Sequence, residues 1–225
     1  MATKGGPNII TDGLILALDA ANTKSYPGSG TTWFELSGNG NNGVLSGGPT
    51  FSNGTISFDG TNDFVTISND GTKFDSWRTG QTVTIWMNHT FISGRKNPWD
   101  QAYGGTSTWT HEQGANINGY YGTAGSNTTP YTSTNSGTTP TGVWNCMTRT
   151  HDTSTVRWFK NDINTQTSGN SYGTLGDTNA NVRIGLGYAD YWIGQMGIVM
   201  AYSRALTPEE ITQNYNALKS RFELS

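Results

Sequence analysis

One short run of residues limits the fold of this chain more than any other. In Phe58-Asp59-Gly60-Thr61-Asn62-Asp63-Phe64-Val65, an Asp-Gly turn and a further polar pair lie between two short alternating apolar stretches. This arrangement is typical of a β-hairpin. We therefore expect a hairpin over residues 56–67 and a chain built mainly from strands.

Further strands are indicated along the chain. Leu14–Leu18 is apolar on both faces, as in a strand buried within a sandwich. The other expected strands are residues 82–87, Trp144–Thr150, Val156–Lys160, Val182–Leu186 and Ile198–Tyr202. Residues 22–48 are rich in Gly, Asn and Ser and are expected to form a long ordered loop.

One helix is indicated near the end of the chain. Thr207-Pro208-Glu209-Glu210 has the form of a capping box with proline at the first helical position. Apolar residues then recur at helical spacing and should pack against the sandwich. These elements predict an all-β fold, a two-layer antiparallel β-sandwich with one short C-terminal helix.

Length and composition exclude several classes of protein. With 225 residues the chain fits one domain, 1–225. Only 13% of its residues are charged and its net charge is −3, so the basic patches that bind nucleic acid are not expected. No apolar run is long enough to span a membrane, and residues 1–7 lack the apolar core of a signal peptide. Export by an ordinary signal peptide is therefore not expected.

Several segments resemble one family in their order along the chain. After the Asp-Gly run come Gln81–Met87, Gly142–Asn145 and Ile193–Ile198, followed by the final helix. This succession resembles concanavalin A-like lectin/glucanase domains of the laminin G-like and pentraxin-related type, which implies a jelly roll. The opening, residues 6–43, is similar to the version found in structural proteins of tailed bacteriophages. That resemblance implies a virion protein made in the host cytoplasm.

No catalytic pattern is apparent, so we expect a protein that is not an enzyme. A glycoside hydrolase on this fold would need paired acids, and no Glu-x-Asp-x-x-Glu pattern occurs. The adjacent Glu209 and Glu210 are explained by the helix cap. Cys146 fits a small core residue better than a nucleophile, and His89, His111 and His151 are scattered. A polysaccharide-cleaving enzyme remains the weakest alternative.

The family resemblance also raises the question of calcium. Relatives often hold this ion with loop acids, and Asp100 and Asp190 fall near the corresponding loops. Calcium takes six to eight oxygen ligands, whereas each loop here offers one acid. We therefore expect no metal and no cofactor.

Aromatic residues gather in a region expected to be a long loop, residues 89–140. The candidate ligand-binding residues there are Trp99, Tyr103, Trp109, Tyr120, Tyr121 and Tyr131. Their rings could stack on sugars, form a subunit interface or pack the loops onto the sandwich. Loop packing and subunit contact rank above sugar binding, although the three can coexist.

The leading hypothesis is a non-enzymatic virion structural protein, a capsid decoration or a tail-associated component that attaches through its sandwich surface. Its expected partners are capsid or tail proteins, further copies of itself in a homo-oligomer, and host-surface polysaccharide. The alternative is a carbohydrate-binding, lectin-like module that acts in host adhesion. Neither hypothesis involves nucleic acid or membrane.

Overall fold

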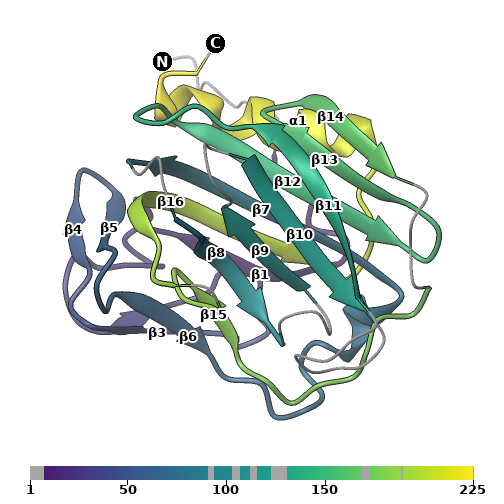
Figure 1. Cartoon of the computed structure of the whole chain (residues 1–225). Helices are drawn as coiled ribbons and strands as arrows, with labels where there is room; N and C mark the ends of the chain where they lie inside the picture. Colours follow the sequence, from purple (N-terminus) through teal and green to yellow (C-terminus); the bar gives the residue numbers. More distant parts are fainter. Residues whose placement is uncertain are drawn as a thin grey trace.

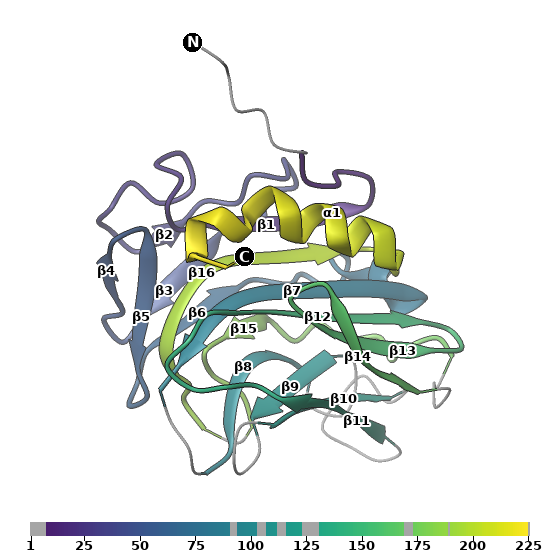
Figure 2. The same ribbon diagram turned by 90° about the horizontal axis from the view of Figure 1, so that it is seen from above.

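A computed structural model describes residues 8–90, 94–102, 107–111, 116–122, 131–168, 173–188 and 190–224. Two antiparallel sheets face each other, and a C-terminal helix covers the outer side of one of them (Figures 1 and 2). Within the described residues α1 is the one α-helix. The expected two-layer β-sandwich with a short C-terminal helix is therefore confirmed.

The first sheet lies beneath the helix. In spatial order it consists of β14 (Ile163–Ser168), β13 (Val156–Lys160), β12 (Asn145–Asp152), β7 (Gly80–His89), β16 (Ile193–Tyr202), β5 (Thr55–Asp59) and β4 (Thr50–Ser52). An eighth strand, β1 (Leu14–Asp19), also pairs with β16. β16 pairs with β7 along most of its length. It also pairs with β5 over residues 193–196 and with β1 over residues 198–202.

The second sheet closes the sandwich. Its order is β11 (Tyr131–Thr138), β10 (Asn116–Gly122), β9 (Ser107–His111), β8 (Lys96–Gln101), β15 (Val182–Ile184), β6 (Phe64–Ile67), β3 (Gly43–Ser46) and β2 (Thr32–Trp33). A short 3-10 helix, η1 (Asp75–Arg78), precedes β7. Among the described helices, none has the length and apolar character needed to cross a membrane.

The main core fills the space between the two sheets. Alternate residues of β7, Val83, Ile85 and Met87, are fully buried there, as their period-2 spacing predicted. Five tryptophans pack in the same core: Trp33, Trp99, Trp109, Trp158 and Trp192. Because rings of this size bury large apolar areas, they supply much of the hydrophobic stabilisation of a sandwich poor in aliphatic residues.

A second core lies between the first sheet and the C-terminal helices, α1 (Pro208–Leu218) and η2 (Lys219–Phe222). Trp86 points outward from β7 and stacks on Tyr215 at 5.6 Å and on Phe222 at 4.6 Å between ring centroids. The predicted capping box is confirmed, because Thr207 and Glu210 each accept a hydrogen bond from the other's backbone N–H. The first sheet is thus covered on both faces.

The expected hairpin over residues 56–67 is wrong. β5 and β6 are present, but β5 pairs with β16 and β4 in the first sheet, whereas β6 pairs with β3 and β15 in the second. The Asp-Gly turn therefore carries the chain from one sheet to the other. Asp59 stabilises this corner by accepting hydrogen bonds from the backbone N–H groups of Thr61 and Asn62.

The interpretation of residues 89–140 as a long loop is also wrong. Four strands of the second sheet, β8 to β11, lie in this region. β9 to β11 are rich in Asn, Thr, Ser and Gly, and β8 contains Lys, Pro and Asp, so these strands lack the apolar alternation by which strands are recognised. The loop expected over residues 22–48 likewise contains β2 and β3.

The other expected strands are present with shifted bounds. β12 and β13 pair as expected, with Arg149 opposite Trp158. β15 ends at Ile184, before the predicted Leu186, and β16 begins at Ile193, well before the predicted Ile198.

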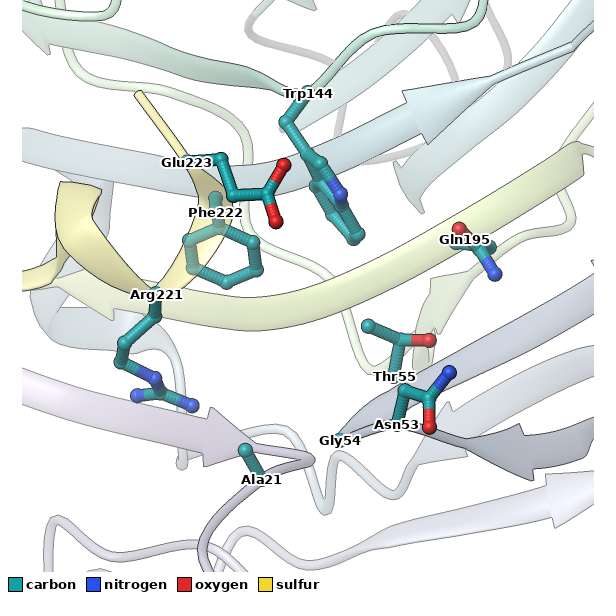
Figure 3. A pocket seen from close by; sticks show the side chains of 9 residues that line it. All are labelled: Ala21, Asn53, Gly54, Thr55, Trp144, Gln195, Arg221, Phe222 and Glu223. Carbon is teal, nitrogen blue, oxygen red and sulfur yellow. The ribbon is translucent and has the colours of Figure 1, made fainter. Parts of the chain in front are cut away.

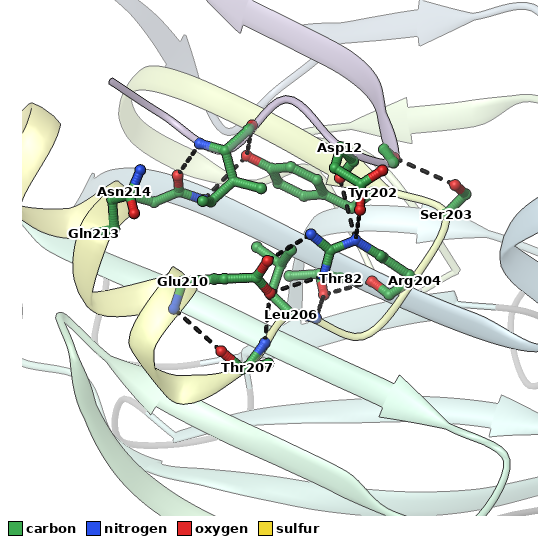
Figure 4. Close-up of polar contacts among 12 residues, drawn as sticks. Asp12, Thr82, Tyr202, Ser203, Arg204, Leu206, Thr207, Glu210, Gln213 and Asn214 are labelled. Carbon is green, nitrogen blue, oxygen red and sulfur yellow. Dashed lines mark hydrogen bonds and ion pairs between the residues drawn. The ribbon is translucent and has the colours of Figure 1, made fainter. Parts of the chain in front are cut away.

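A strap of residues 8–13 crosses the helix side of the molecule (Figure 4). The backbone N–H of Ile10 donates to Asn214 Oδ1 at 2.8 Å, and Tyr202 Oη donates to the carbonyl oxygen of Ile10 at 3.1 Å. Nearby, Arg204 donates to both carboxylate oxygens of Glu210 and pairs with Asp12. These contacts tie the start of the described chain to its last helix.

Candidate functional site

A polar cavity of about 310 Å³ lies on the outer side of the first sheet, beside the end of η2 (Figure 3). Its walls come from segments far apart in the sequence. They are Ala21, Asn53, Gly54, Thr55, Trp144, Gln195, Arg221, Phe222 and Glu223. We call this the Trp144 pocket. Its volume is at the lower end of the roughly 300–1,000 Å³ typical of small-molecule sites.

A β-bulge in β16 determines which side chains line the floor of the pocket. The pairing with β7 shifts between Met196 and Ile198, which leaves Gly197 as an extra residue. Met196 therefore points into the sandwich core, whereas Ile198 packs on the helix side. Gln195 is left on the outer face, where it lines the pocket. Without the bulge, the alternation along this strand would place Gln195 and Ile198 on opposite faces.

Gly197 also allows the C-terminal wall to lie close to the sheet. A Cβ atom at this position would lie 2.5 Å from Phe222 Cε1 and 2.6 Å from Phe222 Cζ. Such distances are far below van der Waals contact, so only glycine leaves room for the Phe222 ring in its present place. The ring in turn supports Trp144, with 4.6 Å between the ring centroids.

Trp144 provides the aromatic surface of the pocket. It directly precedes β12, and its side chain lies on the same helix-facing side as Cys146. One part of its ring packs against Phe222, and the side chain remains partly exposed at the pocket. In Figure 3 the ring projects into the space opposite Asn53 and Thr55. A supported, partly exposed indole is well suited to receive a flat ligand face.

The opposite wall is the hairpin between β4 and β5. Asn53 and Gly54 have φ values of 51° and 74°, as a type I′ turn requires, and Ser52 pairs with Thr55. A Cβ atom on Gly54 would lie 2.7 Å from Ala21 Cβ, so glycine also permits the approach of the loop after β1. The turn thereby presents the Asn53 amide at the rim.

Two charged residues complete the site. The Arg221 guanidinium donates to both carboxylate oxygens of Asp19, at 2.6 and 2.7 Å. Glu223 has a left-handed backbone conformation with φ of 57°, which is uncommon outside glycine and costs about 1 kcal/mol or more. The described residues give Glu223 no ion-pair partner.

The chemistry of these groups suits recognition of a hydroxyl-rich ligand. Amides both donate and accept hydrogen bonds, and a carboxylate accepts them from hydroxyl groups. The electron-rich face of an indole attracts the polarised C–H bonds of a sugar ring. Asn53, Gln195 and Glu223 surround such a face in the Trp144 pocket.

The aromatic candidates from the sequence lie elsewhere. Trp99 and Trp109 are fully buried in the main core, so neither presents a ring face to a sugar. For these two residues, the packing interpretation applies. Tyr103 lies outside the described residues. Tyr120 and Tyr121 belong to β10 and Tyr131 to β11, and their side chains are not among those described.

Asp100 and Asp190, the candidate calcium ligands, have different surroundings. Asp190 accepts a hydrogen bond from Lys96 Nζ at 2.7 Å, and this contact lowers the pKa of its carboxyl group. Asp100 is buried on β8, whereas Asp190 is exposed at the surface. Among the described residues, no group of three His, Cys, Asp or Glu side chains could hold a metal ion.

The remaining reactive residues are structural where the structure describes them. His89 Nε2 lies 3.1 Å from the carbonyl oxygen of Thr139 and is fully buried. Burial raises the pKa of the Cys146 thiol, which suppresses the reactive thiolate. Burial also raises the pKa of Asp63, whose carboxylate accepts a hydrogen bond from the backbone of Asp59.

Sequence reasoning missed this site. The sequence indicates Trp144 only as the start of a strand, and Asn53-Gly54 is typical of a hairpin turn but gives no sign of a binding site. The bulge at Gly197 and the left-handed Glu223 have no signature in a single sequence. The pocket arises where five separate segments meet, so no local pattern could identify it.

The comparisons with known proteins identify the family. The model of the concanavalin A-like lectin/glucanases superfamily matches residues 59–212, more than half of the chain. The chain therefore belongs to this superfamily, as the order of its segments indicated. No curated protein matches the chain in sequence.

Solved structures confirm the fold at low sequence identity. The binding domain of Paraclostridial Mosquitocidal Protein 1 is 14% identical with a TM-score of 0.75, covering 92% of this chain and 52% of that one. Botulinum neurotoxin type C, whose cell entry depends on interaction with two ganglioside molecules, is 12% identical with a TM-score of 0.72, covering 93% and 52%. Trypanosoma rangeli sialidase in complex with sialic acid is 14% identical with a TM-score of 0.71, covering 99% and 36%. The chain thus spans about half of each toxin structure and about a third of the sialidase.

Proposed function

We propose that this member of the concanavalin A-like superfamily is a non-catalytic, lectin-like module that binds a glycan in the Trp144 pocket. The observation that carries the proposal is the partly exposed indole of Trp144, which faces the amides of Asn53 and Gln195 and the carboxylate of Glu223. This combination matches the faces and the hydroxyl groups of a sugar ring. The lectin-type fold and the ganglioside interaction of a structural neighbour support the same ligand class.

The arrangement of acids supports binding rather than hydrolysis. A glycosidase needs two carboxyl groups that flank the scissile bond, one of them free to transfer a proton. Glu223 is the one carboxylate among the described residues that line the Trp144 pocket, and both oxygens of nearby Asp19 accept hydrogen bonds from Arg221. Release of reducing ends from bound polysaccharide above the rate of a protein-free blank would contradict this part of the proposal.

Binding is tested with the full chain on a glycan array, followed by calorimetric titration of the ligands found. Replacing Trp144 with alanine should weaken binding at least tenfold, because the stacking surface is lost. The substitution also removes a contact with Phe222, so the melting temperature must be measured in parallel. A variant that stays folded and binds as tightly as the parent would refute the site.

A matched control variant is Phe34→Ala. Phe34 is also aromatic but is 44% exposed and is not among the residues that line the pocket. This variant should retain full glycan affinity. Equal losses in both variants would indicate a general effect on the fold rather than a contact with the sugar.

The setting of the module is a further part of the proposal. The similarity of residues 6–43 to structural proteins of tailed bacteriophages supports a place on the virion. There, capsid or tail proteins and further copies of the chain would be its partners, and host-surface polysaccharide would be the ligand. Mass spectrometry of purified particles should detect the protein in stoichiometric amounts. Its absence from every particle fraction would exclude this setting and leave glycan binding to be judged by the array.

A further inference from the structure

We propose that the glycan site extends past Arg221 into a second hollow and selects uncharged oligosaccharides over sialylated ones. This inference rests on the proposed function and specifies its ligand class. It draws on two observations, the adjoining hollows and the balance of charge along them.

The second hollow adjoins the Trp144 pocket. It has a volume of about 400 Å³ and is lined by Asp19, Ala21, Asn22, Thr23 and Arg221. Ala21 and Arg221 line both spaces, so the two form neighbouring parts of one groove. The second hollow is shallow and open to solvent, so a ligand there would lie along the surface. A ligand seated against Trp144 can therefore extend along the loop after β1, and a chain of several sugar units would occupy both parts.

The charges along this groove disfavour an acidic ligand. Arg221 is its cation, and its guanidinium is already bound at both ends by the Asp19 carboxylate. Glu223 adds a second carboxylate without an ion-pair partner among the described residues. The lining therefore has a net negative charge. A sialic acid carboxylate placed here would be repelled by the excess negative charge, and the Asp19 carboxylate already neutralises the guanidinium and takes two of its five N–H donors.

This preference is opposite to the one that the structural neighbours suggest. The neighbours include a sialidase holding sialic acid and a toxin that interacts with gangliosides. Shared fold does not transfer a ligand, because specificity depends on the side chains of the site. Here the Asp19–Arg221 pair neutralises the group that would otherwise attract a carboxylate.

The test uses an array of matched glycans of one to four sugar units, each present in neutral and sialylated form. The parent protein should bind neutral members at least tenfold more tightly than their sialylated counterparts. Replacing Glu223 with glutamine should narrow this difference severalfold, because one repelling charge is removed. Equal or tighter binding of the sialylated members by the parent would overturn the inference while leaving glycan binding intact.

The extent of the groove is tested with Thr23→Trp. Thr23 is exposed in the second hollow, so a bulky side chain there should obstruct that part alone. Binding of tri- and tetrasaccharides should weaken at least fivefold, and binding of monosaccharides should not change. Unchanged binding of the longer glycans would refute the extended groove. If the parent protein binds no glycan on the array, the proposed function is refuted, and this inference with it.

Discussion

The interior of the sandwich contains polar side chains, whose burial is costly unless they have hydrogen-bond partners. Arg149 is fully buried between the sheets, where its Nη2 donates to Gln81 Oε1 at 2.6 Å and to Ser107 Oγ at 2.7 Å. The guanidinium also lies 5.9 Å from the centre of the Trp158 ring. His151, two residues along the same strand, is fully buried too. A sequence pattern does not predict this polar layer, because Arg is almost never fully buried unless it is paired, and His is of intermediate burial.

His151 predicts a loss of stability in mild acid. Burial, and next the charge of Arg149, lower the pKa of this side chain from its usual 6.5 to about 4. The unfolded chain therefore binds a proton at higher pH than the folded protein does. The stabilisation is complete above about pH 6.5 and is lost as the pH falls toward 4, by about 3 kcal/mol in total.

Urea unfolding measured between pH 7 and pH 4 checks this prediction. The free energy of unfolding of the parent should decrease as the pH falls from 7 to 4. That of His151→Gln should change much less over the same range. The paired carboxylates, such as Asp152 and Glu210, have lowered pKa values and lose their contribution mainly below this window. If the free energy of unfolding falls equally with pH in the parent and the variant, groups other than His151 cause the loss of stability.

At the scale of elements, the sequence located β5 and β6 but predicted the wrong pairing for them. The turn at Asp59–Gly60 reverses the chain, but the apolar residues on either side of it face one core from opposite sheets. The hairpin that does form, between β4 and β5, contains Asn53–Gly54. Local residues specify a reversal, whereas pairing depends on distant strands such as β16.

The helix was predicted from its first residues because its signals are local. Thr207, Pro208 and Glu210 interact with one another, so their spacing alone contains the information. The strands between residues 96 and 138 were missed for the opposite reason. They are held by neighbours across the sheet, and their own residues have little apolar alternation.

The bulge in β16 yields a prediction at this scale. Gly197→Ala should destabilise the fold by about 1–3 kcal/mol, because the new methyl group would overlap the Phe222 ring and displace it. The displacement should also weaken glycan binding, since Phe222 supports Trp144. Thermal unfolding and titration of the glycan ligand measure the two effects.

Gly80→Ala is the matched control for this substitution. Gly80 begins β7 in the same sheet, and a Cβ atom there would meet its nearest neighbours at an ordinary 3.4 Å. Because a methyl group fits there at ordinary contact distances, the free energy of unfolding should change clearly less in Gly80→Ala than in Gly197→Ala. A Gly197→Ala protein as stable as this control would mean that the ring moves aside freely.

At the scale of the whole molecule, the strap and the C-terminal helices form a third layer on the outer face of the first sheet. The strap of residues 8–13, the first sheet and α1 meet at three hydrogen-bonding groups (Figure 4). Asn214 Nδ2 donates to Tyr202 Oη at 3.0 Å, Tyr202 donates to the carbonyl of Ile10, and the N–H of Ile10 donates back to Asn214. This closed ring joins parts of the chain about 200 residues apart, and the same layer provides the C-terminal wall of the Trp144 pocket.

Removing the amide at the centre of this ring tests how strongly the third layer is held. Asn214 is buried, so Asn214→Ala leaves the N–H of Ile10 and the hydroxyl group of Tyr202 each without one partner. The expected cost is about 2 kcal/mol. The pKa of Tyr202, which burial raises to about 12, should rise further, because the hydrogen bond from Asn214 now lowers it. Hydrogen exchange at the Ile10 amide should accelerate before that of β7, whereas uniform acceleration throughout the chain would mean that the strap and the sandwich unfold as one unit.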